Sequence, residues 1–280
     1  MLAKLFTAII AENITRLVEK EQPLPENHYG GRPGRMTTDM VHVLVDKIKS
    51  TWRKGRMVSV LFLDVEGAFP NAVTDRLLHN LRKCRIPEVY TKVIWLILEG
   101  RRTRLRFDDF ISDPIWIDNG IGQGDPLSMV LYILYNADLL DIALNPEEES
   151  LGFVDNAMIM AEGKNTKETL NIITDFMERD DSSFSWSTAH NSKFEIDKLA
   201  LVHFSKRNTN ELNPGPAAPA LRLKERLIKT VSSYKYLGIH LDSKLNWSIQ
   251  MQKAISKATA WILLFQRLTR PSLGMSPKHM

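Results

Sequence analysis

The sequence predicts an α+β fold. Helical and strand-like patterns are mixed along the chain without regular βαβ alternation, which argues against a parallel α/β fold. Residues 57–64 have the apolar, β-branched composition of a buried strand, and residues 151–161 have the pattern of a β-hairpin. The chain has 280 residues, 44% hydrophobic and 25% charged, which is enough for one large domain or two modest ones.

The N-terminal part is expected to form two helices and then a strand. Residues 2–20 carry apolar side chains at helical spacing. The apolar face consists of Leu2, Leu5, Phe6, Ile9, Ile10, Ile14 and Leu17. Thr37 or Thr38 is expected to cap a second helix that ends near residue 53. The apolar run that follows predicts a buried strand ending at Asp64.

The middle of the chain is expected to be helical, with one basic hairpin. Residues 73–83 and 88–99 have helical periodicity and are separated by a proline. Residues 101–118 contain two strand-like segments on either side of an acidic turn, and they predict a hairpin whose first strand is rich in arginine. Pro126 is suited to the first turn of a further helix, expected to continue to Leu144.

The C-terminal part begins with the hairpin over residues 151–161, with Asp155 and Asn156 expected in its turn. The later elements expected are an amphipathic helix over 165–179, strands over 194–204 and 234–241, a linker or exposed loop over 213–219, and a long helix over 246–268.

Composition excludes several classes of protein. The net charge of +4 is mild, and the basic clusters at 47–56 and 101–106 could bind phosphates or could be solvated faces. The single cysteine, Cys84, excludes an internal disulfide and a Cys-rich zinc site. No apolar run approaches the roughly 18 residues of a membrane span, and the N-terminus is expected to be an amphipathic helix instead of a signal peptide. We therefore expect an intracellular protein, nuclear or cytoplasmic, with no membrane partner.

Two carboxylates are the main candidates for chemistry. Asp64 ends a strand and Asp155 lies in a hairpin turn, so both are expected at the edge of an apolar sheet, where a bound cation would offset desolvation. Phosphoryl transfer commonly uses two divalent cations about 3.5–4 Å apart, and magnesium prefers carboxylate oxygens. Each acid taken singly is an ordinary turn or cap residue. Their order along the chain, with the glycine-rich residues 119–128 between them, is more specific.

The ordered segments resemble the reverse transcriptase domain of non-LTR (LINE-type) retrotransposons, especially those of fungal genomes. The matching segments are 30–39, 63–69 (LDVEGAF), 122–128 (GQGDPLS), 153–156 (FVDN), 191–205 and 236–239 (YLGI). They are similar to the finger motif and to the five palm motifs of that family. The resemblance covers roughly residues 27–270 and implies a right-hand polymerase fold, with fingers, an antiparallel palm sheet packed on helices, and a partial thumb.

The resemblance also implies a division of the chain. Residues 1–60 would be partial fingers, 61–241 the palm with inserted finger helices and the hairpin, and 242–280 the start of a truncated thumb. The chain begins after a finger segment that the family carries and ends partway into the thumb. We therefore expect a fragment of a decayed or partial element.

The resemblance implies a role for each matching residue. Asp64, Asp155 and the backbone carbonyl of Val65 would hold two Mg²⁺ ions, with Mn²⁺ as an alternative. Asn156 stands where the family usually has a second aspartate, which removes one negative charge from the catalytic group. Lys198 would stabilise charge on the departing pyrophosphate.

Further residues would contact nucleotide or nucleic acid. Phe69 would exclude a 2′-hydroxyl from the incoming sugar, and Gln123 and Gly124 would lie against the nucleotide. The residues expected to contact nucleic acid are Arg35, Tyr236, Leu237 and Gly238.

The activity implied is RNA-directed DNA polymerisation from an RNA template and DNA primer with dNTPs. The alternative is a catalytically inactive remnant that at most binds nucleic acid, because Asn156 and the short ends weaken the site. A group II intron maturase would share the fold, but residues 30–35 and 119–128 look LINE-like. The sequence leaves the oligomeric state open.

Overall fold

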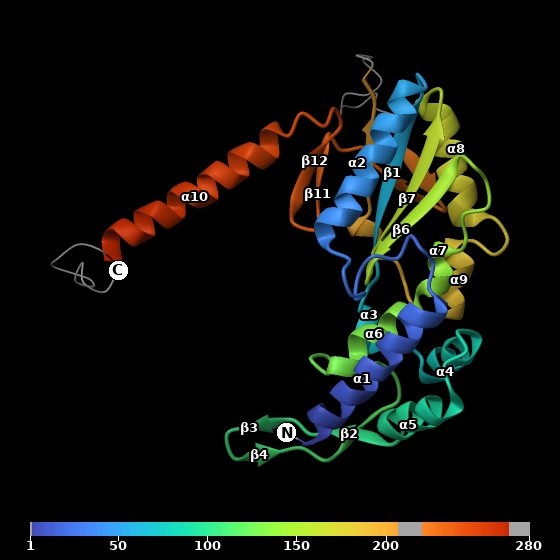
Figure 1. Cartoon of the computed structure of the whole chain (residues 1–280), viewed down its shortest axis with the longest axis vertical. Helices are drawn as coiled ribbons and strands as arrows, with labels where there is room; N and C mark the ends of the chain where they lie inside the picture. Colours follow the sequence, from blue (N-terminus) through green and yellow to red (C-terminus); the bar gives the residue numbers. More distant parts are fainter. Residues whose placement is uncertain (1, 207–219, 269–280) are drawn as a thin grey trace.

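The computed structural model, which describes residues 2–206 and 220–268, is centred on a four-stranded antiparallel sheet (Figure 1). Its strands, in spatial order, are β6 (Glu148–Phe153), β7 (Asn156–Gly163), β1 (Met57–Asp64) and β8 (Ala200–Phe204). β1 is a central strand and is buried along its length until Asp64. Asp64 is half-buried at the end of the strand, on the edge of the sheet that all the strand ends form. The strand expected over residues 57–64 is therefore confirmed.

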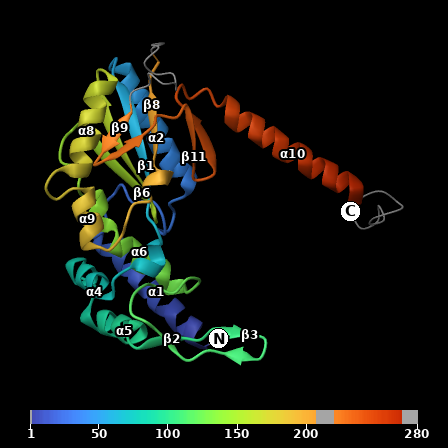
Figure 2. The same cartoon turned by 180° about the vertical axis from the view of Figure 1, so that it is seen from behind.

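Helices cover both faces of the sheet. Val58, Val60 and Phe62 of β1 pack in the core beneath α2 (Thr37–Arg53), whereas Leu61 and Leu63 belong to the core on the opposite side. That second core includes α8 (Thr166–Glu178), seen in front of the sheet in Figure 2. Successive strand residues point to opposite faces. A nearly continuous apolar run is consequently what a strand covered on both faces requires.

A helical layer lies beyond the end of the sheet at which Asp64 and Asp155 lie (Figure 1). It contains α1 (Leu2–Glu21), α3 (Ala68–Asn71), α4 (Thr74–Lys83), α5 (Glu88–Leu98), α6 (Pro126–Tyr135) and α7 (Ala137–Leu140). The single helix expected from Pro126 to Leu144 is interrupted at Asn136, which joins α6 to α7. The prediction that Thr37 or Thr38 caps α2 was also wrong. Met36 occupies the N-cap position, and its N–H donates to the Asp39 side chain at 2.7 Å.

The apolar face expected for α1 is only partly buried. Ile10 and Ile14 lie in the core, but the apolar residues before Thr7 are exposed. The Thr7 hydroxyl donates to Asp125 Oδ2 at 3.1 Å, at the N-cap of α6. The part of α1 before Thr7 therefore lies beyond the start of α6 and is exposed.

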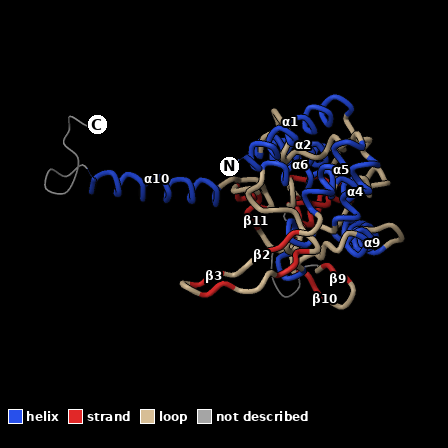
Figure 3. Tube along the Cα trace, turned by 90° about the horizontal axis from the view of Figure 1, so that it is seen from below, coloured by secondary structure: helices blue, strands red, loops and turns tan. Residues whose placement is uncertain are grey.

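Two hairpins project from this framework. The one expected over residues 101–118 is confirmed, with β2 (Arg101–Thr103) paired to β5 (Ile115–Ile117) and β3 (Arg106–Phe107) paired to β4 (Phe110–Ile111). Figure 3 shows its tip extending from the body. The strand expected over 234–241 is instead a hairpin, β11 (Ser233–Tyr236) and β12 (Ile239–Asp242). Leu237 and Gly238 form its turn with φ of 46° and 87°, a backbone that glycine favours.

Other differences are local. The strand expected over 194–204 is confined to β8, because Lys198 lies in a 3₁₀ turn, η1 (Ile196–Lys198). The sequence did not reveal α3, α9 (Ser183–Ala189), β9 (Leu221–Leu223) or β10 (Arg226–Ile228). The linker expected over 213–219 lies outside the described residues.

The long helix expected near the C-terminus is α10 (Ser248–Leu268), which extends away from the body in Figures 1 and 3. Residues 251–266 are exposed. None of the helices in the described part of the chain has the length and apolar character of a membrane span.

Candidate active site

The two expected carboxylates meet at one edge of the sheet. Asp64 is the last residue of β1 and pairs directly with Asn156, the first residue of β7. The turn that joins β6 to β7 consists of Val154 and Asp155, and Phe153 pairs with Asn156 across it. Asn156 was expected in this turn, but it lies in the strand. Asp155 is thus adjacent to the residue that faces Asp64.

The turn has a strained backbone at Val154. Its φ is +59°, which a β-branched residue rarely adopts, and its side chain is only 8% exposed. Such a conformation costs on the order of 1–3 kcal/mol and persists only where the surroundings impose it. The sequence preference for Asn and Asp in turns had favoured the position one residue later.

The electrostatics of the pair favour a bound cation. Burial raises the pKa of Asp155, and the charge of Asp64 acts in the same direction. The Asn156 amide donates to Asp155 Oδ1 at 3.1 Å and lowers the pKa, which partly offsets these effects. A divalent cation held by both carboxylates would relieve the repulsion and replace lost hydration.

Lys198 reaches the same edge from η1. Its Nζ lies 3.3 Å from Asp64 Oδ2 and 2.5 Å from Glu195 Oε2. The hydrogen bond to Glu195, and then the one to Asp64, raises the pKa of Lys198. The Glu195 N–H donates to the Asp64 carbonyl at 2.9 Å and ties this segment to β1. The structure therefore brings Lys198 to the acids, and Glu195 is a neighbour that the sequence did not indicate.

Val65 and Phe69 follow Asp64 in the turn into α3. Val65 forms an antiparallel β-bridge with Phe194. The two hydrogen bonds of this bridge are made by the residues on either side of Val65, so the Val65 carbonyl is not used in it.

Phe69 is half-buried and stacks on Tyr132, with ring centroids 4.8 Å apart. Tyr132 is fully buried, its hydroxyl has no partner among the described residues, and burial raises its pKa, reinforced by the charges of Asp155 and Asp64. Nothing in the sequence singled out this tyrosine.

The glycine-rich loop is fastened to the same segment. The Ile121 N–H donates to the Phe69 carbonyl at 2.8 Å, and the Gly120 N–H donates to the Ala72 carbonyl at 2.7 Å. Gln123 and Gly124 follow as exposed residues. The loop is thus held against α3, and Gln123 and Gly124 lie a few residues from the point of attachment.

Arg35 and Tyr236 have structural partners. Arg35 donates to the backbone carbonyls of Glu26 and His28, the latter at 3.0 Å, and its guanidinium lies 5.1 Å from the centre of the Tyr29 ring. Tyr236 is 2% exposed, and its hydroxyl lies 3.4 Å from the Asn156 carbonyl.

The Tyr236 ring is packed in the core against Phe62, and the expected contact of this residue with nucleic acid stays a prediction. Its neighbours are differently placed: Gly238 is exposed and Leu237 is half-buried.

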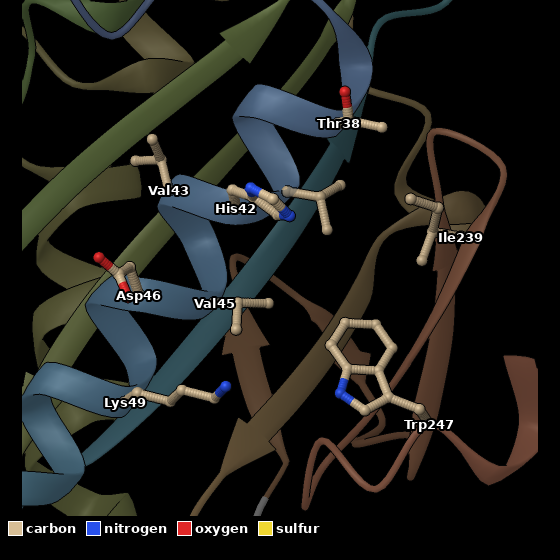
Figure 4. Close-up of a pocket in the computed structure, with 9 residues that line it drawn as sticks. Thr38, His42, Val43, Val45, Asp46, Lys49, Ile239 and Trp247 are labelled. Atoms are coloured by element: carbon tan, nitrogen blue, oxygen red, sulfur yellow. The ribbon is translucent and has the colours of Figure 1, made fainter.

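A separate cleft lies between α2 on one side and Ile239 of β12 and Trp247 on the other (Figure 4). It has a volume of about 610 Å³, and Lys49, Ile239 and Trp247 are among its lining residues. Neither Asp64 nor Asp155 lines it. The cleft is therefore distinct from the carboxylate edge.

The two acids would offer oxygen ligands, which suit hard divalent cations such as Mg²⁺ or Mn²⁺. Within residues 2–206 and 220–268, no group of three or more His, Cys, Asp or Glu side chains is arranged to hold a metal. Two carboxylates at a sheet edge fit Mg²⁺, which usually keeps water and substrate phosphate as its other ligands.

The fold and the paired acids define the palm of a right-hand polymerase. The sequence profile of the reverse transcriptase (RNA-dependent DNA polymerase) family matches residues 1–241. The chain belongs to this family, which confirms the expectation from the ordered motifs.

Similar proteins include two from Drosophila melanogaster. The probable RNA-directed DNA polymerase from transposon X-element is 29% identical over 255 residues, and the RNA-directed DNA polymerase from mobile element jockey is 24% identical over 252 residues. Each alignment covers 88% of this chain and 26% of the relative. The chain therefore spans about a quarter of the length of these relatives. The expected fungal type stays a prediction.

Solved structures agree on the fold. Telomerase from Candida tropicalis in complex with a fragment of telomeric RNA superposes with a TM-score of 0.59 at 10% identity, over 85% of this chain and 37% of that one. The apo telomerase gives 0.57 at 9% identity, over 88% and 41%.

Proposed function

We propose that this chain is the catalytic fingers–palm part of an RNA-directed DNA polymerase, which extends a DNA primer on an RNA template with dNTPs. The observation that carries the proposal is the placement of Asp64 and Asp155 at one sheet edge, with Lys198 Nζ 3.3 Å from Asp64 Oδ2. The names of the two fruit-fly relatives support the same activity.

Asp64, Asp155 and the Val65 carbonyl would hold two Mg²⁺ ions, for which Mn²⁺ could substitute. When bound, the metals would activate the primer 3′-hydroxyl and stabilise the charge on the leaving oxygen. Lys198 would place a positive charge beside the departing pyrophosphate.

The nucleotide would lie between the Phe69 segment and the glycine-rich loop. Phe69, supported by Tyr132, would limit the space at the sugar 2′ position, with Gln123 and Gly124 on the other side. Gly124 has a φ of +77° with open space around its α-carbon, which would permit close approach of a ligand.

The nucleic acid would approach along Arg35 and the Leu237–Gly238 turn. We assign residues 1–60 to the fingers, 61–241 to the palm and 242–280 to the start of the thumb, of which 269–280 lie outside the described residues. We also place the protein inside the cell, in the nucleus or the cytoplasm.

Primer extension on poly(A)–oligo(dT) tests the proposal. We expect dTMP incorporation in Mg²⁺ or Mn²⁺ that is abolished by Asp64→Ala and by Asp155→Ala. Asp46→Ala is the matched control, because Asp46 is a carboxylate on α2 that lines the separate cleft. Incorporation that is absent from the parent protein in both metals, despite binding to the template–primer, would instead support the inactive remnant.

A further inference from the structure

The turn that carries Asp155 lacks the residue its backbone favours. The first position of such a turn, with positive φ, usually takes glycine, but here it is Val154 at +59°. Such a conformation must be imposed by neighbouring groups. The groups that contact Val154 are therefore candidates for controlling where the Asp155 carboxylate lies.

Asn136 hydrogen-bonds to Val154. Its side-chain Nδ2 donates to the Val154 carbonyl, and its Oδ1 lies 3.3 Å from His28 Nε2. Asn136 is 4% exposed and His28 is fully buried. Burial lowers the pKa of His28 to about 4, so the ring is neutral near pH 7. With Nδ2 used by Val154, His28 must donate its Nε2–H to Asn136 Oδ1.

The chain around His28 holds the other side of the turn. The Gly152 N–H donates to the Asn27 carbonyl at 3.1 Å, and the Tyr29 N–H donates to the Gly152 carbonyl at 2.8 Å. A Cβ at Gly30 would lie 2.4 Å from Val154 N, which is too close for any side chain at position 30. Residues 27–30 and the α6–α7 junction thus both contact the turn and the strand that leads into it.

We propose that Asn136, oriented by His28, is a positioning residue: its bond to the Val154 carbonyl fixes the strained turn and so places Asp155 next to the residue that faces Asp64. This inference rests on the proposed metal role of the two carboxylates for its functional consequence. The positioning of the turn itself can be measured without metal.

Hydrogen exchange measured by NMR on the whole chain tests the positioning. Asn136→Leu keeps the side-chain shape but removes the donor. We expect the Gly152 and Asn156 amides to exchange about tenfold faster in this variant. Asn80→Leu is the matched control: Asn80 is 1% exposed and donates to the Tyr135 carbonyl at 2.9 Å, next to Asn136, without contacting the turn.

Unchanged exchange at the turn in Asn136→Leu would overturn the proposal, as would equal acceleration in Asn80→Leu. Where Asn136→Leu does not fold, the His28 variants decide. His28→Gln retains an N–H donor for Asn136 and is expected to keep the turn protected, whereas His28→Leu is expected to expose it. Equal exchange in these two variants would reject the role of His28 and Asn136.

Titration with Mn²⁺, followed by electron paramagnetic resonance, gives the functional readout. We expect Asn136→Leu to weaken Mn²⁺ binding about 10–100-fold relative to Asn80→Leu, the usual effect of removing a residue that orients a ligand. Equal affinity in the two variants would contradict the positioning of Asp155. Mn²⁺ binding by the parent protein that does not depend on Asp64 would refute the proposed metal site, while the exchange result would still decide whether Asn136 holds the turn.

Discussion

Asp64 and Asn156 are direct partners across β1 and β7, so an amide-bearing residue lies opposite a carboxylate-bearing one where the two strands meet the turn. The side-chain amide of Asn156 donates from Nδ2 to Asp155 Oδ1 at 3.1 Å. This hydrogen bond lowers the pKa of Asp155 and so stabilises its charged form in the absence of metal.

Asn156→Asp is expected to have opposite effects with and without metal. A third carboxylate should raise the affinity for Mg²⁺ and the rate of incorporation about 10–100-fold. Without metal it should lower the melting temperature, because like charges are brought together in a half-buried place. Primer extension at several Mg²⁺ concentrations and melting with and without Mg²⁺ measure both effects. Asn156→Ala is the control, and an aspartate variant no more active than the alanine variant would contradict the expectation.

Lys198→Met is expected to separate metal binding from turnover. The ammonium lies 3.3 Å from Asp64 Oδ2 and competes with a metal for that carboxylate. Its removal should tighten Mn²⁺ binding about two- to fivefold, the scale of an exposed ion pair. Incorporation at saturating dNTP should fall by about 10²-fold or more, because the leaving group loses its positive neighbour. Lys193→Met removes an exposed lysine from the same segment and should change neither quantity. Loss of Mn²⁺ affinity in Lys198→Met would refute this interpretation.

The central part of the fold could be predicted from local sequence patterns. The continuous apolar run of β1 gave its bounds and its end at Asp64, because a strand covered on both faces has no polar face to interrupt the run. The hairpin that follows placed a second acid at the same edge. The proximity of Asp64 and Asp155 could therefore be predicted from two strand ends, with the family resemblance giving it a chemical meaning.

Contacts between distant segments were not predictable from local patterns. The burial of Tyr236 depends on the β11–β12 hairpin packing over Phe62, which is far away in the sequence. Asn136 looked like a position within one long helix, but it ends α6 and bonds to Val154. Val154 itself carries no turn signal, because a β-branched residue rarely adopts a positive φ such as the 59° found here.

Gly120→Ala is expected to loosen the attachment of the glycine-rich loop to α3. Gly120 has a φ of +92°, and a Cβ would lie 2.4 Å from the Pro70 carbonyl oxygen. Gly100→Ala is the matched control, because its φ is +62° but nothing lies within 4 Å of the added carbon. Both variants bear the cost of a positive φ, about 1 kcal/mol, and Gly120→Ala adds a backbone clash of about 1–3 kcal/mol. Urea unfolding measures the difference, and equal loss in the two variants would show that the loop shifts freely from α3.

Acid is expected to destabilise the protein through two buried histidines. Burial lowers the pKa of His28 and of His190 from 6.5 to about 4. The His190 ring is held neutral, because Nδ1–H donates to the Trp186 carbonyl and Nε2 accepts from Arg76, both at 3.0 Å. Unfolding releases each ring to bind a proton, so the stability is fully present above pH 6.5 and is lost as pH falls towards 4, by about 3 kcal/mol per ring. Urea unfolding between pH 7.5 and 4 is expected to show this loss of stability in the parent protein and about half of it in His190→Gln. The control His79→Gln, which changes an exposed histidine, is expected to show all of it. A pH dependence unaltered in His190→Gln would assign the acid sensitivity to other groups.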